Sequence, residues 1–368
     1  MDIYFALIGM VLILPVACCG IRNPEKRKNA ILTVSILCLF LLTALKAPSV
    51  GKDIAGYKRV YDSMKYQAWN NYDITWMEWG YEFLMMVFTH IFKASFQTFM
   101  ICIYGFVYYS YYRFFKSYSQ DYTTSVILYI CFTFLTFDMS AVRTVIGVAI
   151  CLFAIPYAQR DGIKNFVKYI LIVLIAAQIH KSAYVFLAVY FVIKIKLTIK
   201  SSVAYIGVPI ALLAFKSQFY GIINAYFMAV QESSASLGGN LLVYIASIVL
   251  TGFVWIYYKR YNKIVTEEET SSSGLAGYFS DTGLSMRMIY VGIVLQLFGA
   301  GTVLTRMAQY FQIFLLVLIP NNLVRLDLKS RAIVKTILYL LAIMYFVRYS
   351  LVPDPLDIVP YEVFWKAG

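Results

Sequence analysis

The pattern of apolar and polar positions predicts many short helices that cross a membrane. Apolar runs recur along the whole chain, and short segments rich in Lys and Arg separate them. A helix needs about 20 residues to cross a bilayer, so several of these runs are short for that task. We interpret twelve runs as spans: residues 3–19, 30–45, 96–112, 122–137, 141–158, 166–179, 183–193, 202–215, 241–258, 288–303, 307–324 and 333–349. The predicted fold is therefore an all-α, polytopic membrane protein.

Three polar regions interrupt the spans, and none is long enough to bury a core of its own. We therefore expect a single membrane domain over residues 1–368. Residues 46–95 form a predicted outer loop, in which 81–92 is too short to span and is expected to be an interfacial helix. Residues 259–286 form a predicted flexible cytoplasmic loop with three consecutive glutamates. Residues 350–368 form a predicted outer tail.

The composition agrees with a membrane protein and orients it. Hydrophobic residues make up 61% of the chain and charged residues 14%, against about 25% in soluble domains. The net charge of +13 lies in short loops rather than on one soluble face, so we expect no nucleic acid partner. Segments that we place inside hold 20 of the 32 Lys and Arg residues, which predicts that both termini lie outside. The scattered cysteines and two histidines predict neither a metal site nor a cofactor.

Residues 176–183 are the most unusual stretch, because Gln178, His180, Lys181 and Ser182 interrupt the apolar run 166–193. An ionisable residue at membrane depth costs roughly 2.5–3.5 kcal/mol on insertion scales, and such residues are usually functional. One interpretation is structural: Lys181 reaches an interface while His180 and Ser182 bond the carbonyls of a turn. The other is that the turn opens into a watery cavity, where His180 handles a proton or an anion.

Other charged and aromatic residues converge on the same outer side in the predicted topology. Arg143, Arg306 and Arg348 lie at outer ends of spans, where a guanidinium can reach lipid headgroups or bind a pyrophosphate through two oxygens. Asp53 either caps the helix that carries Tyr57 or belongs to a site. The carboxylate of Glu78 lies among Trp76, Trp79 and Tyr81, an arrangement that suits either a membrane interface or a sugar-binding face.

Six short motifs follow one another along the chain: Gly51-Lys52-Asp53-x3-Tyr57, Glu78-Trp79-Gly80-Tyr81, Val142-Arg143-Thr144-Val145-Ile146-Gly147-Val148-Ala149-Ile150, Ile179-His180-Lys181-Ser182-Ala183, Arg306-x3-Tyr310-Phe311 and Val359-Pro360-Tyr361. Taken in this order, they resemble the EpsG/Wzy-type bacterial polysaccharide polymerases. The family commonly has Gln after the arginine of the third motif, and this chain has Thr144.

The resemblance implies an enzyme that extends a surface glycan (O-antigen, capsule or exopolysaccharide) at the outer face of the bacterial cytoplasmic membrane. The growing chain would leave undecaprenyl pyrophosphate and join a hydroxyl of the incoming lipid-linked repeat unit. The implied partners are that lipid-linked oligosaccharide, the bilayer and a chain-length-determining membrane protein. Two rival functions are a transporter or flippase of lipid-linked oligosaccharide and a glycosyltransferase that uses a polyprenyl-phosphate sugar.

Within such a reaction the candidate residues take distinct roles. Cationic groups stabilise the leaving pyrophosphate, and Arg143 and Arg306 are the first candidates, followed by Lys181 and Arg348. A base must accept the proton of the attacking hydroxyl, and His180 suits this role because an ordinary histidine titrates near about 6.5. Glu78 or Asp53 are the alternative bases. Tyr57 and Tyr81 are expected to bind substrate.

Overall fold

A computed structural model describes residues 1–68, 77–195, 207, 215, 275–299, 304–324 and 326–366. Trp76 and nearly all of the predicted spans 202–215 and 241–258 lie outside these residues. Packing groups the chain into two compact units, Met1–Tyr184 with Ile319–Gly368, and Val185–Leu318. The single membrane domain expected over residues 1–368 stays a prediction.

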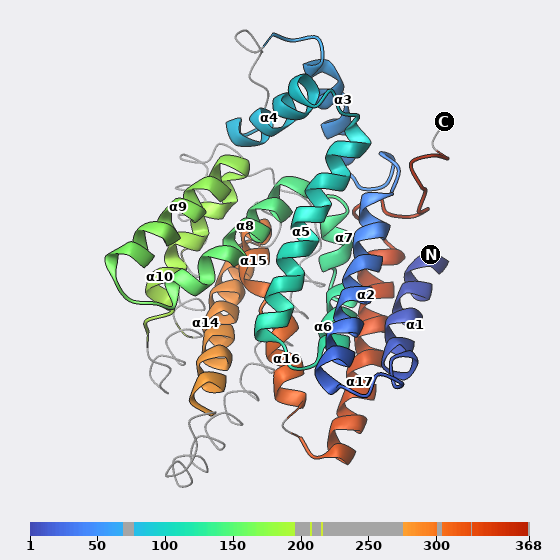
Figure 1. Ribbon diagram of the computed structural model, residues 1–368, viewed down its shortest axis with the longest axis vertical. Helices are drawn as coiled ribbons and strands as arrows, with labels where there is room; N and C mark the ends of the chain where they lie inside the picture. Colours follow the sequence, from blue (N-terminus) through green and yellow to red (C-terminus); the bar gives the residue numbers. More distant parts are fainter. Residues whose placement is uncertain are drawn as a thin grey trace. The chain divides into compact units, whose positions relative to one another are not determined.

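The first unit is a helical assembly in which α5 and α8 connect α3, α4 and α9 to the remaining helices. Helix α5 packs against α2 and α8, α8 packs against α9, and α6 contacts α1, α2 and α17 (Figure 1). Helices α3 and α4 lie at one end, where α3 contacts α5 and α4 contacts α9. The helices are α1 (Asp2–Ala17), α2 (Pro24–Ala44), α3 (Ile54–Met64), α4 (Trp79–Met86), α5 (Phe96–Tyr118), α6 (Tyr122–Cys131), α7 (Phe134–Asp138), α8 (Val142–Ala158), α9 (Ile163–Ile179) and α17 (Leu328–Phe346).

Polar residues at the helix starts explain why several helices extend beyond the apolar runs. The Asn23 side chain accepts the N–H groups of Glu25 and Lys26, so α2 begins at Pro24, before the apolar run at 30. Ser95 caps α5 and Asp121 caps α6 in the same way. Such caps satisfy backbone donors that the helix itself leaves unpaired.

Several predicted spans are not continuous helices. The run 122–137 divides into α6 and α7 at Thr133, whose φ of 70° is left-handed. The run 183–193 is mostly a 3₁₀ helix, η2 (Lys181–Ala188), followed by the short α10 (Val189–Val192). The run 307–324 divides between α15 (Leu304–Gln312) and α16 (Leu315–Leu323). These breaks cannot be predicted from apolar composition alone, because an apolar run can continue through a residue whose backbone is not helical.

Among the described residues, two helical segments are long and apolar enough to cross a membrane, Pro24–Ala44 and Leu328–Leu351. The second joins α17 to a π-helical turn, η4 (Val347–Leu351). The prediction of twelve spans is therefore not confirmed. Apolar side chains of α17 such as Ile333, Leu340 and Met344 are 61%, 59% and 65% exposed, which fits a lipid environment.

The C-terminal tail and the start of the first large loop lie together at one end of the first unit. An antiparallel bridge pairs Lys46 with Val363, and the amide of Ala47 donates to the carbonyl of Glu362 at 2.8 Å. The Tyr4 hydroxyl of α1 donates to the carbonyl of Ile358 at 2.8 Å. Segments near both ends of the chain therefore contact each other and the start of this loop, while the predicted location of both termini outside stays a prediction.

The second unit packs aromatic side chains against α14 (Leu275–Gly299) and α15. The ring of Phe186 contacts those of Tyr310 and Phe311, with centroids 6.3 and 5.9 Å away. Because α14 begins at Leu275, the last part of the predicted flexible loop 259–286 is helical. Leu and Ala, which favour helices, occupy the first two positions of α14 and explain the earlier start.

Candidate functional site

Glu78 is the centre of a largely buried polar cluster at the end of the first unit that carries α3 and α4. It directly precedes α4 in an extended conformation (φ −75°, ψ 142°), and its side chain does not cap that helix. Its carboxylate instead accepts hydrogen bonds from three groups of other elements. The donors are Nη1 of Arg143 at 2.5 Å, Nδ1 of His180 at 2.8 Å and the backbone N–H of Lys181 at 3.1 Å.

Arg143, in the first turn of α8, connects this carboxylate to a pair of buried tyrosines. Its Nε donates to the Tyr57 hydroxyl at 3.4 Å, and its guanidinium carbon lies 5.6 Å from the centre of the Tyr57 ring. The Tyr81 ring meets that of Tyr57 edge to face at 5.7 Å. The guanidinium is thereby held by an ion pair, a hydroxyl and an aromatic face, which together restrict its orientation.

His180 is the residue at which α9 ends. Its backbone is extended (φ −155°, ψ 122°), and the chain continues directly into η2. The predicted interruption of the apolar run is thus confirmed. Because an ionised carboxylate only accepts, Nδ1 carries the proton in the contact with Glu78. The other ring nitrogen, Nε2, is buried and has no hydrogen-bond partner among the described residues.

The environment of Glu78 keeps its carboxyl ionised. Burial by itself raises the pKa of Glu78, but the hydrogen bond and charge of His180, the charge of Arg143 and the amide of Lys181 lower it to about 2. A carboxylate with so low a pKa is a weak base at neutral pH. Glu78 is therefore suited to orient His180 and to hold Arg143, rather than to take a proton from a hydroxyl.

Two glycines allow the backbones around this cluster to approach closely. A Cβ at Gly80 would lie 2.7 Å from both Cβ and the carbonyl oxygen of Gln178, so a larger residue would separate α4 from the end of α9. Gly51, with φ of 104°, lies against the carbonyl of Met139, which a Cβ would meet at 2.1 Å. The first contact sets Glu78 beside His180, and the second places the loop against the turn before Arg143.

A comparison with known families decides the classification. The model of the EpsG family matches residues 29–363, which is most of the chain. The chain belongs to the EpsG family. It is thus a membrane protein of polysaccharide biosynthesis, in a family associated with glycosyltransferase-like polymerases. Searches of curated proteins and of solved structures found no match.

In this EpsG-family protein the predicted site residues divide into two groups. Glu78, Arg143, His180, Tyr57 and Tyr81 lie in one cluster, as the preceding contacts show. Lys181 joins the cluster through its backbone, while its side chain is exposed. Asp53 precedes α3, and its side chain makes no cap hydrogen bond. Arg348 is exposed with its guanidinium 5.4 Å from the Tyr349 ring, and Arg306 lies in α15 of the second unit.

Asp138 is a structural residue of the EpsG-family site whose role was not predicted. Its carboxylate accepts from the hydroxyls of Tyr129 and Tyr111, and its backbone carbonyl accepts from Tyr104 at 2.8 Å. The side chain is buried. The network holds the turn between α7 and α8 and so positions the first turn of α8, where Arg143 lies. The sequence offers a weak signal: tyrosines recur at 104, 108 and 111 on one helix face.

The close contact between Gly80 and Gln178 was also missed, since no local pattern marks it. Gly80 was noted only as part of a motif.

Among the residues that the structure describes, no group of three His, Cys, Asp or Glu side chains could hold a metal ion.

Proposed function

We propose that this EpsG-family protein is a surface-polysaccharide polymerase that works at the outer face of the bacterial cytoplasmic membrane. It transfers the growing glycan from undecaprenyl pyrophosphate to a hydroxyl of the incoming lipid-linked repeat unit. The observation that carries the proposal is the His180 ring, which is oriented by Glu78 through Nδ1 and leaves Nε2 without a partner among the described residues. The family match supports the reaction class.

The proposed step needs one base and one cationic site. Nε2 of His180 accepts the proton of the acceptor hydroxyl while that oxygen forms a bond to the anomeric carbon of the growing chain. The bond between this carbon and the pyrophosphate oxygen breaks, and the pyrophosphate leaves with the electron pair. Glu78 stabilises the imidazolium that forms, because its carboxylate already accepts from Nδ1.

The leaving pyrophosphate is a strong anion and needs positive charge nearby. Arg143 supplies it next to His180, in a low-dielectric environment where Arg143 as a whole is only 7% exposed. Lys181, whose side chain is exposed beside the cluster, is a second candidate, and we retain Arg306 and Arg348 as predictions. The buried Tyr81 hydroxyl, which has no hydrogen-bond partner among the described residues, keeps its proton because burial raises the pKa of Tyr81. It can therefore donate to a sugar oxygen.

A substitution of His180 tests the base directly. His180→Gln keeps hydrogen-bonding groups but has no proton acceptor of comparable basicity, so the rate of ladder formation should fall by about 10²–10⁴-fold. The assay incubates purified protein with lipid-linked repeat unit and separates the products on a gel. Substrate binding, measured separately, should remain, because the base acts in the chemical step.

The matched control is the other histidine of the chain. His90 follows α4 in a π-helical turn, η1 (Val87–Ile91), and its ring contacts the carbonyls of Met86 and Gln67 at 3.2 and 2.7 Å. His90→Gln should therefore retain the wild-type rate. Equal rates for the two variants would contradict a base at His180 and return this residue to a structural role.

A further inference from the structure

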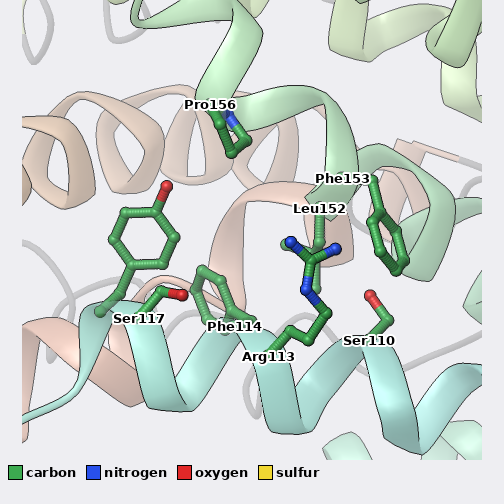
Figure 2. A pocket seen from close by; sticks show the side chains of 8 residues that line it. Ser110, Arg113, Phe114, Ser117, Leu152, Phe153 and Pro156 are labelled. Atoms are coloured by element: carbon green, nitrogen blue, oxygen red, sulfur yellow. The ribbon is translucent and has the colours of Figure 1, made fainter.

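An open hollow lies between α5 and α8, at the opposite end of α8 from the candidate site. Its empty space of ≈ 320 Å³ is bounded by residues of both helices, including Arg113, Ser117, Leu152, Phe153 and Pro156 (Figure 2). Pro156 is 13 residues beyond Arg143 in α8, which places the hollow about 20 Å along the helix from the site.

Arg113 provides the positive charge of this hollow. Its guanidinium extends from α5 toward α8 and lies 4.6 Å from the centre of the Phe153 ring. Within the described part of the chain, it forms no ion pair with a carboxylate. A guanidinium positioned on an aromatic face and without an acidic partner is prepared to bind an anion such as a phosphate.

Pro156 removes the helical hydrogen-bond donor of one residue that lines the hollow. Proline has no amide hydrogen, so the carbonyl of Leu152 lacks the donor that it would have in a regular helix. Ser117 adds a hydroxyl at the rim, whereas the Ser110 hydroxyl already donates to the carbonyl of Ala149 at 2.7 Å. The hollow therefore offers a cation for a phosphate and an acceptor for a neighbouring hydroxyl or ammonium group.

Exposed aromatic rings continue from the hollow along α5. The Phe153 ring stacks on the Phe106 ring with centroids 5.9 Å apart, and the Tyr109 ring centroid lies 6.4 Å from the Phe153 ring centroid. Phe106 and Tyr109 are 38% and 58% exposed, so they form an apolar path that begins beside Arg113. A free phosphate would leave this path uncovered, whereas the acyl chain of a lipid would cover it.

We propose that this hollow binds the phosphate headgroup of a membrane phospholipid, with an acyl chain along Phe106 and Tyr109. The headgroup carries a hydroxyl or an ammonium group, which donates to the Leu152 carbonyl. Basic pockets between membrane helices bind anionic lipids in this manner. The site differs from the candidate polymerase site in residues and position, so it depends on none of the chemistry proposed for His180.

Native mass spectrometry of the full-length, delipidated protein tests the proposal. The probes are dioleoyl phosphatidylglycerol, dioleoyl phosphatidic acid, dioleoylglycerol and inorganic phosphate, added separately to protein in detergent. One phosphatidylglycerol should bind most tightly, and Arg113→Gln should weaken it about tenfold or more, since hydrogen bonds to charged groups are worth ~1.5–3 kcal/mol. Lys116→Gln is the matched control, because Lys116 is exposed on the same helix with its ammonium over Tyr112 instead.

The outcomes separate the lipid from its rivals. Equal affinity of the Arg113→Gln and Lys116→Gln proteins would overturn the proposal, as would binding of dioleoylglycerol as tight as that of phosphatidylglycerol. Inorganic phosphate could also bind as tightly as phosphatidylglycerol and lose affinity equally in Arg113→Gln. That result would show a site for a free anion, with no contribution from the acyl chains, and would also overturn the proposal. Pro156→Ala supplies the missing amide, so it should reduce the preference for phosphatidylglycerol over phosphatidic acid, and an unchanged preference would remove the carbonyl from the site.

Discussion

Replacing Gly80 with alanine tests whether the spacing between α4 and α9 controls the candidate site. The added Cβ would lie 2.7 Å from the Gln178 Cβ and from the Gln178 carbonyl oxygen. Non-bonded carbon atoms stay about 3.5–4.0 Å apart, so the start of α4 must move by about 1 Å. Part of the clash is with backbone, and a change of side-chain rotamer at Gln178 cannot relieve it.

The movement acts on the residue that organises the cluster, because Glu78 lies two positions before Gly80. A displacement of about 1 Å can cost roughly 10²-fold in rate, which equals ~2.7 kcal/mol of transition-state stabilisation. Overpacking itself costs about 1–3 kcal/mol of folding free energy, so the protein should still fold. We expect Gly80→Ala to lower the polymerisation rate by about 10²-fold with a modestly reduced melting temperature.

Gly56→Ala is the matched control. Gly56 lies within α3, and a Cβ there meets nothing within 4 Å. This substitution should leave the rate unchanged and increase stability by roughly 0.5–1 kcal/mol, since alanine favours helices over glycine. Both variants are compared by the gel ladder assay and by thermal unfolding in the same detergent. If Gly80→Ala polymerises as fast as Gly56→Ala, then the close contact with Gln178 does not position Glu78 for catalysis.

Three further predictions follow from the cluster and from the charge pattern. Arg143→Lys keeps the positive charge but loses the forked guanidinium that reaches both Glu78 and Tyr57. Polymerisation activity should therefore fall at least tenfold while the amount of protein in the membrane stays normal. Wild-type activity of this variant would show that the forked geometry is not used. In a cysteine-free background, a cysteine that replaces Tyr66, which is 91% exposed, should react with an impermeant thiol reagent in spheroplasts. A cysteine that replaces Lys26 should not react. The reverse labelling would place the candidate polymerase site in the cytoplasm. Since the pKa of Glu78 is lowered to about 2, its stabilising contribution is complete above its ordinary pKa and is lost only as the pH falls toward 2. The difference in melting temperature between the wild-type protein and Glu78→Gln should therefore stay constant between about pH 7 and 5, and a difference that shrinks over this range would contradict the low pKa of Glu78.

Local sequence patterns were sufficient for the membrane character and for the identity of the unusual residues. Runs of apolar residues lower the free energy only when they are buried or in lipid, so composition alone indicates a membrane protein. Ionisable side chains are costly in such surroundings, and for this reason His180 and Arg143 could be recognised without a structure. The break at His180 was also predictable, because a polar cluster interrupts an apolar run there.

Only the tertiary structure decided how these residues work together. Glu78 is 65 residues from Arg143 and 102 from His180 in the sequence, and no periodicity connects positions so far apart. Their contact depends on the backbone approach that Gly80 allows, which is a property of packed helices and not of a segment. The same contact disfavours Glu78 among the candidate bases, since the hydrogen bond from His180, the charge of Arg143 and the amide of Lys181 lower the pKa of Glu78, and we therefore propose Nε2 of His180 as the group that accepts the proton. The Asp138 carboxylate likewise accepts hydrogen bonds from tyrosines on α5 and α6, a contact between separate helices that only their packing creates.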